Sequence, residues 1–200
     1  MIKDIIFDVG GVLLQYKEEQ YYHYISKKNN ISEEKVSHTI NPLIEKLEVN
    51  KITLKQMRSI MSKELGIPNV DLEWVRFFKV AAKPDKYMIA LAKRLKKSYR
   101  ISLLSNISRS RYVIARRMFI NSIGAGKIFT SCYMGIRKPS KKIYTTVLKE
   151  LNAKPEETIF IDNLKANVDG AKRAGIKAIQ YHNHRQIIMA LRHLGVKAGR

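Results

Sequence analysis

The chain has 200 residues, and its 38 Lys and Arg against 17 Asp and Glu give a formal net charge of +21 at pH 7. Hydrophobic residues make up 45% of the sequence and charged residues 28%, a globular composition that excludes an intrinsically disordered chain. The single cysteine, Cys132, excludes a scaffold held by internal disulfides. No apolar run approaches the roughly 20 residues of a membrane span and the N-terminus has no signal-peptide pattern, so a cytoplasmic protein without a membrane partner is expected.

Short apolar segments typical of strands alternate along the chain with longer segments of helical periodicity. A strand at 5–7 comes first, and the spacing then predicts four helices, at 17–28, 32–47, 53–65 and from 71 to a stop before Pro84, with no convincing strand between 15 and 83. The remaining elements alternate in type: helices at 85–97, 108–122, 140–151, 165–174 and 184–193, and strands at 100–104, 128–130, 158–161 and 177–181.

This alternation predicts an α/β protein with a mainly parallel sheet, because right-handed helical crossovers return each strand in the same direction. Residues 1–14 and 84–200 are expected to form the α/β core, and residues 15–83 an all-helical insertion between the first strand and the rest. Ligands of such sheets bind at the carboxyl ends of the strands. Polar residues at those ends are therefore the candidates for a functional site.

Three predicted strands end in polar side chains: Asp8, then Ser105 with Asn106, then Asp162. Two carboxylates that converge at one edge of a sheet suit a hard divalent cation such as Mg²⁺, which prefers oxygen ligands. A hydroxyl and an amide suit the oxygens of a phosphate group. Alone, an Asp at the end of a strand is usually a turn or cap residue. The prediction of a functional site therefore depends on finding several such polar residues, each at the end of its own strand.

Two loops add to this set. Gly10 and Gly11 permit a sharp turn and leave main-chain amides free for an anion. Lys138, beside a rigid proline, would neutralise charge on a phosphoryl group and on a carboxylate nucleophile. Asn167 and Asp169, inside the predicted helix at 165–174, are expected at the surface or in a cap.

In this order the segments resemble the motifs of the haloacid dehalogenase-like hydrolases, a family composed chiefly of phosphatases. Residues 5–13 (IIFDVGGVL) look like the first motif, whose Asp is the nucleophile, and residues 103–106 (LLSN) like the second, whose hydroxyl binds phosphate. Residues 138–139 (KP), followed by Ile143-Tyr144, look like the third motif, with its charge-stabilising Lys. Residues 160–163 (FIDN), followed by Asn167-Val168 and Gly170-Ala171, look like the fourth, with its metal-binding acids.

The resemblance implies a Rossmann-like parallel sheet flanked by helices, with residues 15–83 as the helical cap of the phosphatase and epoxide-hydrolase-like branch. It implies a Mg²⁺-dependent phosphatase that acts on a small phosphorylated metabolite through an aspartyl-phosphate at Asp8. The metal would be held by Asp8, the main-chain carbonyl of Gly10 and Asp162, with Asn163 beside them. The phosphoryl group would be bound by the amides of the glycine pair and by three side chains: Ser105, Asn106 and Lys138.

Two positions depart from the family pattern. Gly10 stands where the family usually has a second Asp that acts as general acid and base, and Asn163 stands where it usually has the second of two paired acids. General acid–base help contributes about 10²- to 10⁴-fold, so the departures predict a slow enzyme or one limited to good leaving groups. They leave open a catalytically degenerate protein that binds a phosphorylated ligand or a partner, and, as a lesser alternative, a haloacid dehalogenase.

The positive charge is concentrated in residues 83–154, which contain 18 Lys and Arg and two Asp and Glu. This excess could draw anionic substrates toward the strand ends, or it could form a solvated helix face. Only the charge supports nucleic acid as a partner, so it is kept as a minor alternative. A small phosphorylated substrate is the partner that we expect.

Overall fold

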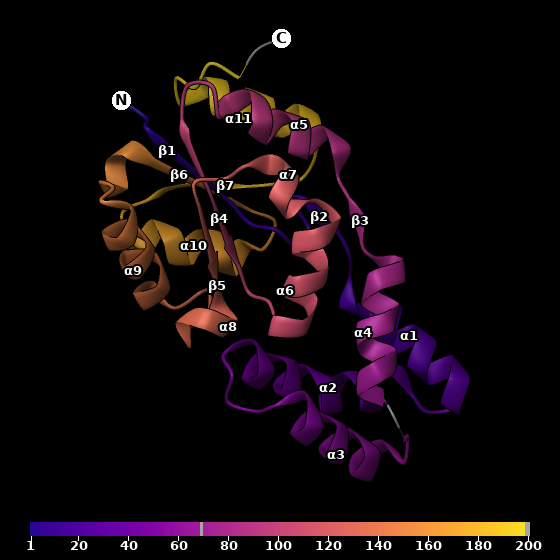
Figure 1. The fold of residues 1–200 in the computed structure, drawn as a ribbon. Coiled ribbons are helices and arrows are strands. Elements are labelled where there is room, and N and C mark those ends of the chain that lie inside the picture. Colours follow the sequence, from indigo (N-terminus) through magenta and orange to yellow (C-terminus); the bar gives the residue numbers. More distant parts are fainter. Residues whose placement is uncertain (69, 199–200) are drawn as a thin grey trace.

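The computed structural model describes residues 1–68 and 70–198, and a five-stranded parallel sheet in the order β5-β4-β1-β6-β7 forms its centre (Figure 1). The strands of this sheet are β1 (Asp4–Phe7), β4 (Arg100–Ser105), β5 (Lys127–Thr130), β6 (Thr158–Asp162) and β7 (Lys177–Gln180). The central strand β1 pairs with β4 on one side and with β6 on the other. The α/β fold class with a Rossmann-like parallel sheet is thereby confirmed.

Helices cover both faces of the sheet (Figure 1). One face packs against α5 (Lys86–Leu95), α6 (Arg109–Ala115), the π-helical turn η1 (Arg116–Ile120), α7 (Asn121–Ile123) and α11 (His184–His193). The other face packs against α9 (Lys141–Leu151) and α10 (Lys165–Arg173). Two shorter elements, α8 (Ser131–Met134) and η2 (Pro155–Glu157), lie in the connections.

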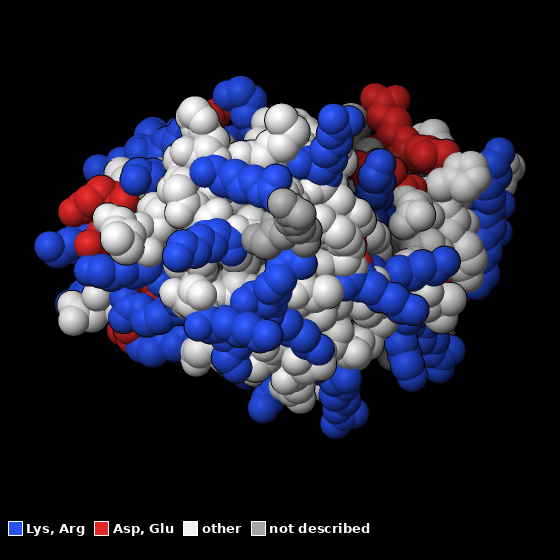
Figure 2. Space-filling view, turned by 90° about the horizontal axis from the view of Figure 1, so that it is seen from above, with Lys and Arg blue, Asp and Glu red and all other residues white. Residues whose placement is uncertain are grey.

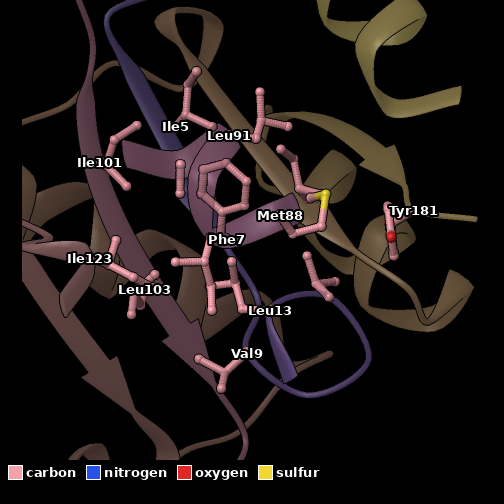
Figure 3. Close-up of a cluster of buried hydrophobic side chains, with 14 of the residues drawn as sticks. Ile5, Phe7, Val9, Leu13, Met88, Leu91, Ile101, Leu103, Ile123 and Tyr181 are labelled. Atoms are coloured by element: carbon pink, nitrogen blue, oxygen red, sulfur yellow. The ribbon is translucent and has the colours of Figure 1, made fainter. Parts of the chain in front are cut away.

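Alternate side chains of β1 enter the two apolar layers, because successive residues of a strand point to opposite faces. Ile5 and Phe7 belong to the layer under α5, where Figure 3 shows Phe7 beside Met88 and Leu91. Ile6 belongs to the opposite layer. Because both faces are buried, the strand is a continuous apolar run rather than an alternating one, as is usual for parallel sheets.

The segment expected as one helix at 108–122 is divided in the structure. Helix α6 ends at Ala115, the wider turn η1 follows, and α7 ends before Gly124. Phe119 and Ile120, adjacent in sequence, are both buried against the sheet. A widened turn is compatible with burying two neighbouring apolar side chains, which a regular 3.6-residue period would separate by about 100°.

The helical insertion, residues 15–83, contains four helices: α1 (Glu18–Asn29), α2 (Glu33–Glu48), α3 (Leu54–Leu65) and α4 (Val70–Ala81). They enclose an apolar cluster of their own, in which Trp74 and Tyr21 are fully buried. The Ser32 hydroxyl accepts the amide of Lys35 at the start of α2, a common helix N-cap. None of the helices in the described part of the chain has the length and apolarity needed to cross a membrane.

A short two-stranded antiparallel sheet joins the insertion to the rest of the chain. It consists of β2 (Leu14–Gln15) and β3 (Lys83–Pro84), and Leu14 pairs with Pro84. The sequence expectation of no strand within residues 15–83 was therefore wrong at both ends of that range. Strands of two residues have no periodicity that a sequence pattern can show, and they form here because the chain leaves and re-enters the sheet at the same place.

The insertion lies beyond the carboxyl end of the parallel sheet, opposite α6 and α8 (Figure 1). The amino end of the sheet is a different surface. Figure 2 looks down on that end and shows Lys and Arg side chains spread over it, with acidic side chains mainly toward the rim. The last turn of α5 and the turn between it and β4 contribute exposed cations to this end: Lys93, Arg94, Lys96 and Lys97.

Candidate active site

Three strands bring polar side chains to the carboxyl edge of the sheet. Asp8 directly follows β1, Ser105 is the last residue of β4, and Asp162 is the last residue of β6. Because β1 lies between β4 and β6, the three residues reach the same edge. All three are buried, with 5%, 3% and 0% of their surface exposed, respectively.

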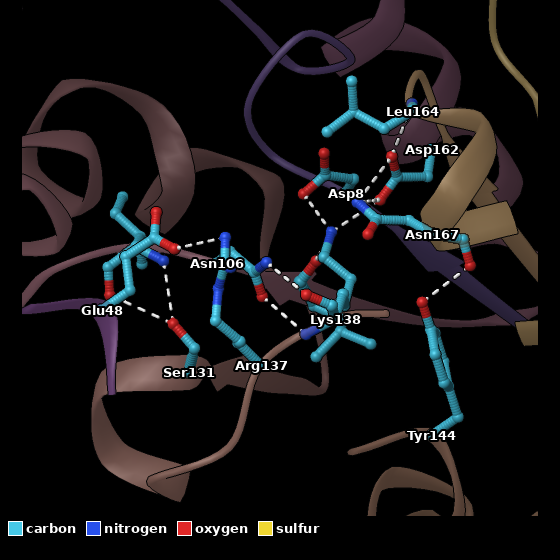
Figure 4. A network of polar contacts seen from close by, with 12 residues as sticks. Asp8, Glu48, Asn106, Ser131, Arg137, Lys138, Tyr144, Asp162, Leu164 and Asn167 are labelled. Carbon is cyan, nitrogen blue, oxygen red and sulfur yellow. Dashed lines mark hydrogen bonds and ion pairs between the residues drawn. The ribbon is translucent and has the colours of Figure 1, made fainter. Parts of the chain in front are cut away.

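Lys138 connects the two carboxylates (Figure 4). Its Nζ atom lies 2.7 Å from Asp8 Oδ1 and 2.6 Å from Asp162 Oδ2, and it donates a third hydrogen bond to the Leu104 carbonyl at 3.1 Å. The residue is only 1% exposed. Because an ammonium group has three donors and all three have acceptors here, its position is well determined.

Burial and mutual attraction act in opposite directions on these charges. For Lys138, burial favours the neutral amine, but the two carboxylates outweigh it and hold the pKa of Lys138 above its usual value. For Asp8, burial and then the negative charge of Asp162 raise the pKa to about 7, although the ammonium of Lys138 acts in the opposite direction. The site therefore concentrates charge in a region from which water is largely excluded.

Asn106 holds the main chain of the lysine loop. Its Nδ2 donates to the Lys138 carbonyl at 3.0 Å, and its Oδ1 accepts the Lys138 amide at 2.9 Å. The sequence predicted that this amide group contacts phosphate; in the structure both of its polar atoms contact the peptide groups of Lys138, and the residue also lines the adjoining cavity. The direct consequence is that the loop carrying the ammonium is tied to the end of β4.

Asn167 orients the second carboxylate. Its Nδ2 lies 3.1 and 3.0 Å from the two oxygens of Asp162, and the Leu164 amide donates to Oδ1 of the same carboxylate at 2.8 Å. The expected surface position was wrong for Asn167, which is 4% exposed, whereas Asp169 pairs with Lys165 at the surface. A signal was available, since the first turn of a helix that follows a strand end lies beside that end.

The two glycines differ in what surrounds them. Gly11 has φ +79°, and a Cβ atom there would lie 2.4 Å from Asn163 Nδ2, so only glycine lets the Asn163 side chain lie against this turn. At Gly10 no heavy atom of the described chain lies within 4 Å of the position of a Cβ atom. The Asn163 Oδ1 atom is buried, and no described residue donates a hydrogen bond to it.

These oxygens form a donor set that fits Mg²⁺. Mg²⁺ is usually bound through one or two carboxylates and retains several waters, and the edge offers Asp8, Asp162 and the unpartnered amide oxygen of Asn163. Within the described ranges, no group of three or more His, Cys, Asp and Glu side chains is placed to bind a metal ion. A cation here would therefore depend on neutral oxygens and water as well as on the two acids.

A cavity of about 610 Å³ lies between this edge and the helical insertion. Its core side includes the glycine turn, Ser105, Asn106 and Asn163, and its far side is formed largely by the insertion. The far wall presents aromatic and charged side chains: Tyr16, Glu18, Glu48, Trp74, Phe78 and, from α6, Arg111.

Arg111 connects α6 to the insertion through a buried network. Its guanidinium forms an ion pair with Glu18 and donates to the Tyr16 hydroxyl at 3.0 Å. The guanidinium carbon lies 3.5 Å from the centre of the Trp74 ring, and the indole Nε1 donates to the same Glu18 carboxylate at 3.4 Å. In the sequence Arg111 is only one of many cations in a basic segment, because no local pattern links residues 93 positions apart.

Glu48 is the last residue of α2 and a second acidic side chain in the cavity wall. Its side chain is 13% exposed, and Arg137 Nη2 lies 3.1 Å from its Oε2, while Arg137 Nη1 lies 2.7 Å from Glu45. Burial raises the pKa of Glu48 to about 7, because it outweighs the attraction of Arg137. Sequence analysis did not single out this residue.

Comparison with known proteins identifies the family. The model of the haloacid dehalogenase-like hydrolase family matches residues 2–175. The chain belongs to this family. The resemblance predicted from the four motifs, and with it the assignment as a hydrolase, is confirmed.

Two phosphatases match nearly the whole chain. The D-ribitol-5-phosphate phosphatase of Bacteroides thetaiotaomicron is 26% identical over 92% of this chain and 93% of its own length. The sesquiterpene phosphatase astK of Aspergillus oryzae is 27% identical over 96% of each chain. The solved structure of a HAD family enzyme from Bacteroides thetaiotaomicron, in complex with magnesium and inorganic phosphate, has the same fold (TM-score 0.78, 24% identity, 91% of this chain and 95% of that one).

Proposed function

We propose that the protein is a Mg²⁺-dependent phosphatase that cleaves a small phosphorylated metabolite through an aspartyl-phosphate at Asp8. The observation that carries this proposal is the buried contact of Lys138 with Asp8 and Asp162. Buried ion pairs contribute little net stability compared with apolar packing, so three dehydrated charges at a strand edge point to chemistry rather than to folding. The two phosphatase relatives support the same reaction.

In this reaction the Asp8 carboxylate attacks phosphorus, and the bond from phosphorus to the leaving oxygen breaks. The leaving oxygen takes its proton from water, because Gly10 has no side chain that could supply one. Water then cleaves the aspartyl-phosphate, which releases inorganic phosphate and restores the carboxylate. Lys138 and Ser105, with the amide of Gly10, bind the phosphoryl oxygens. The expectation of a free amide at Gly11 was wrong, because this amide donates to the Leu14 carbonyl at 2.7 Å.

Mg²⁺, held by Asp8, Asp162 and the carbonyl of Gly10 with Asn163 beside them, would neutralise negative charge between nucleophile and phosphoryl group. Asn106 has a different role in this proposal from the one that the sequence predicted. Its two hydrogen bonds to Lys138 make it a positioning residue for the ammonium group.

The proposal divides the chain into an α/β core of residues 1–14 and 84–200 and a helical cap of residues 15–83. The separate apolar cluster of the insertion and the short β2–β3 junction support this division. We place the enzyme in the cytoplasm, where small phosphorylated metabolites are its expected partners.

One alternative remains specific enough to test. Gly10 and Asn163 replace two acids of the family pattern, as they would in a relative that binds phosphorylated ligands without turnover. A panel of phosphorylated metabolites should be assayed for phosphate release with Mg²⁺ and with EDTA. We expect Mg²⁺-dependent release from a subset of the panel, whereas ligands that raise the melting temperature without any release would establish the binding protein instead.

A further inference from the structure

The cavity has two ends of different chemistry. The glycine turn, Ser105 and Asn163 lie at the core end, where the proposed function places the phosphoryl group. The far wall therefore faces the leaving group. A volume of about 610 Å³ lies within the range of small-molecule sites and exceeds what a phosphate ion alone requires.

Three glutamates line the cavity, and two of them, Glu18 and Glu48, differ in how many hydrogen bonds they accept; the third, Glu19, is exposed to solvent. Glu18 accepts hydrogen bonds from Arg111 at both of its oxygens and from Tyr16 and Trp74 at Oε2. Glu48 accepts none from any residue in the described chain, and its ion-pair neighbour Arg137 lies 3.1 Å away without hydrogen-bond geometry. A carboxyl group keeps free acceptor lone pairs in either protonation state, so Glu48 has unused acceptor capacity in the wall.

A buried carboxyl oxygen that accepts no hydrogen bond is unfavourable even beside a cation such as Arg137, and a bound ligand with a donor group would relieve this cost. A hydrocarbon leaving group would cover the Glu48 carboxylate without offering a donor. A second anionic group would be repelled by it. A hydroxyl group would donate a hydrogen bond to this carboxylate, in a cavity that Trp74 and Phe78 also line.

We propose that Glu48 determines specificity by accepting a hydrogen bond from a leaving-group hydroxyl, so that the substrate is a small polyol or sugar phosphate. This inference rests on the proposed phosphatase function. The two relatives are named for different leaving groups, a pentitol and a sesquiterpene. The inference predicts that this protein acts on the hydroxylated one.

Arg137 gives Glu48 a defined position relative to the reaction. Its two terminal nitrogens contact Glu45 and Glu48 of α2, and its neighbour in sequence is Lys138. The end of α2 is thereby held against the loop that carries the buried ammonium (Figure 4). One short segment, Arg137 with Lys138, therefore positions Glu48 at the leaving group and supplies the ammonium at the phosphoryl group.

The test compares a pentitol 5-phosphate with n-pentyl phosphate, which has the same number of carbons and no hydroxyl groups. The variants are Glu48→Gln and Glu48→Leu. The matched control is Glu45→Gln, because Glu45 is on the same helix and contacts the same arginine but is 62% exposed and lies outside this cavity.

We expect the wild type to prefer the pentitol ester in kcat/KM. Glu48→Leu should reduce this preference about 10- to 100-fold, the effect of losing a hydrogen bond to a charged group, mainly through KM. Glu48→Gln should reduce it less, and Glu45→Gln should leave it unchanged. An unchanged preference in both Glu48 variants, or an equal loss in Glu45→Gln, overturns the inference.

The outcomes also separate this inference from the proposed function. Equal cleavage of both esters by the wild type refutes the role of Glu48 and leaves the phosphatase intact. No cleavage of either ester, or of any member of the metabolite panel, with Mg²⁺ present refutes the phosphatase and the inference with it. Glu48→Gln keeps the size of the side chain, so the test remains valid if Glu48→Leu does not fold.

Discussion

The two edges of the parallel sheet both carry charged side chains, but in different surroundings. At the carboxyl edge, Lys138 is 1% exposed and contacts two carboxylates that are themselves buried. At the amino edge, the cations at the end of α5 are exposed to solvent, as Figure 2 shows for that face. Identical side-chain chemistry therefore has strong local effects at one edge and weak, screened effects at the other.

The contrast between the two edges shows why net charge does not by itself locate a functional site. Residues 83–154 contribute most of the excess, but they supply both edges: Lys138 and Arg111 at one, Lys96 and Lys97 at the other. The charge total alone does not locate a site. Burial and pairing do, because only dehydrated charges interact strongly enough to orient a reaction.

The largest effect is expected at the proposed nucleophile. Asp8→Asn should reduce Mg²⁺-dependent hydrolysis of acetyl phosphate by about 10⁴-fold or more, because the amide cannot form the covalent intermediate. Asp169→Asn, which changes an exposed carboxylate, is the control and should retain full activity. Residual activity above a few per cent in pure Asp8→Asn protein would contradict the assignment.

The comparison of the edges becomes sharper when one lysine is removed from each. Lys138→Met should reduce the free energy of unfolding by about 3 to 5 kcal/mol in EDTA, because two buried carboxylates lose their counter-ion. Lys97→Met, at the exposed edge, should change it by less than about 0.5 kcal/mol. Urea denaturation measures both, and equal losses would mean that burial does not distinguish the edges.

Gly10→Asp tests the missing acid. There is room for the side chain, because no described heavy atom lies within 4 Å of the Cβ position. An acid there can protonate the leaving oxygen, so kcat should rise about 100-fold on an alkyl phosphate and less on p-nitrophenyl phosphate, whose leaving group needs little protonation. Gly10→Asn, of equal size, should give no gain. A matching gain in the Asn variant would point to a steric effect.

Glu48→Gln should change how stability depends on pH. Folding raises the pKa of Glu48 from 4.5 to about 7, so the unfolded chain ionises first and the wild type loses stability as pH rises through that interval. Glutamine does not ionise. Between pH 5 and pH 8 the variant should therefore gain about 2 kcal/mol relative to the wild type in urea denaturation. A constant difference across this range would show that the side chain is better solvated than the structure indicates.

The smallest effect is expected at the amino edge. Its exposed cations should bind an oligonucleotide non-specifically at low salt. The affinity should fall about 10- to 100-fold between 50 and 200 mM salt, because the release of counterions from the nucleic acid becomes less favourable as the salt concentration rises. Fluorescence anisotropy at several salt concentrations measures the slope. Sequence-specific binding that persists at physiological salt would give this edge a function that its solvation does not predict.

Much of this molecule follows from local sequence patterns. The apolar run before Asp8 and the one before Asp162 each predict a buried strand, and a parallel sheet then places both acids at one edge. The helices predicted to begin at residues 32 and 53 also depend on local signals, because Ser32 and Thr53 cap them in the structure. The two-residue strands at Leu14 and Pro84 had no such signal, because their pairing depends on where the insertion returns.

The sequence by itself determined the order of strands and helices, the family motifs and the residues available at each strand end, because these depend on neighbours within a few positions. Only the tertiary structure decided which of those residues meet. It placed Asn106 on the main chain of Lys138, buried Arg111 against Trp74, and put Glu48 in the cavity wall. Such contacts join segments tens of residues apart, so their energies depend on burial and geometry that no local pattern contains.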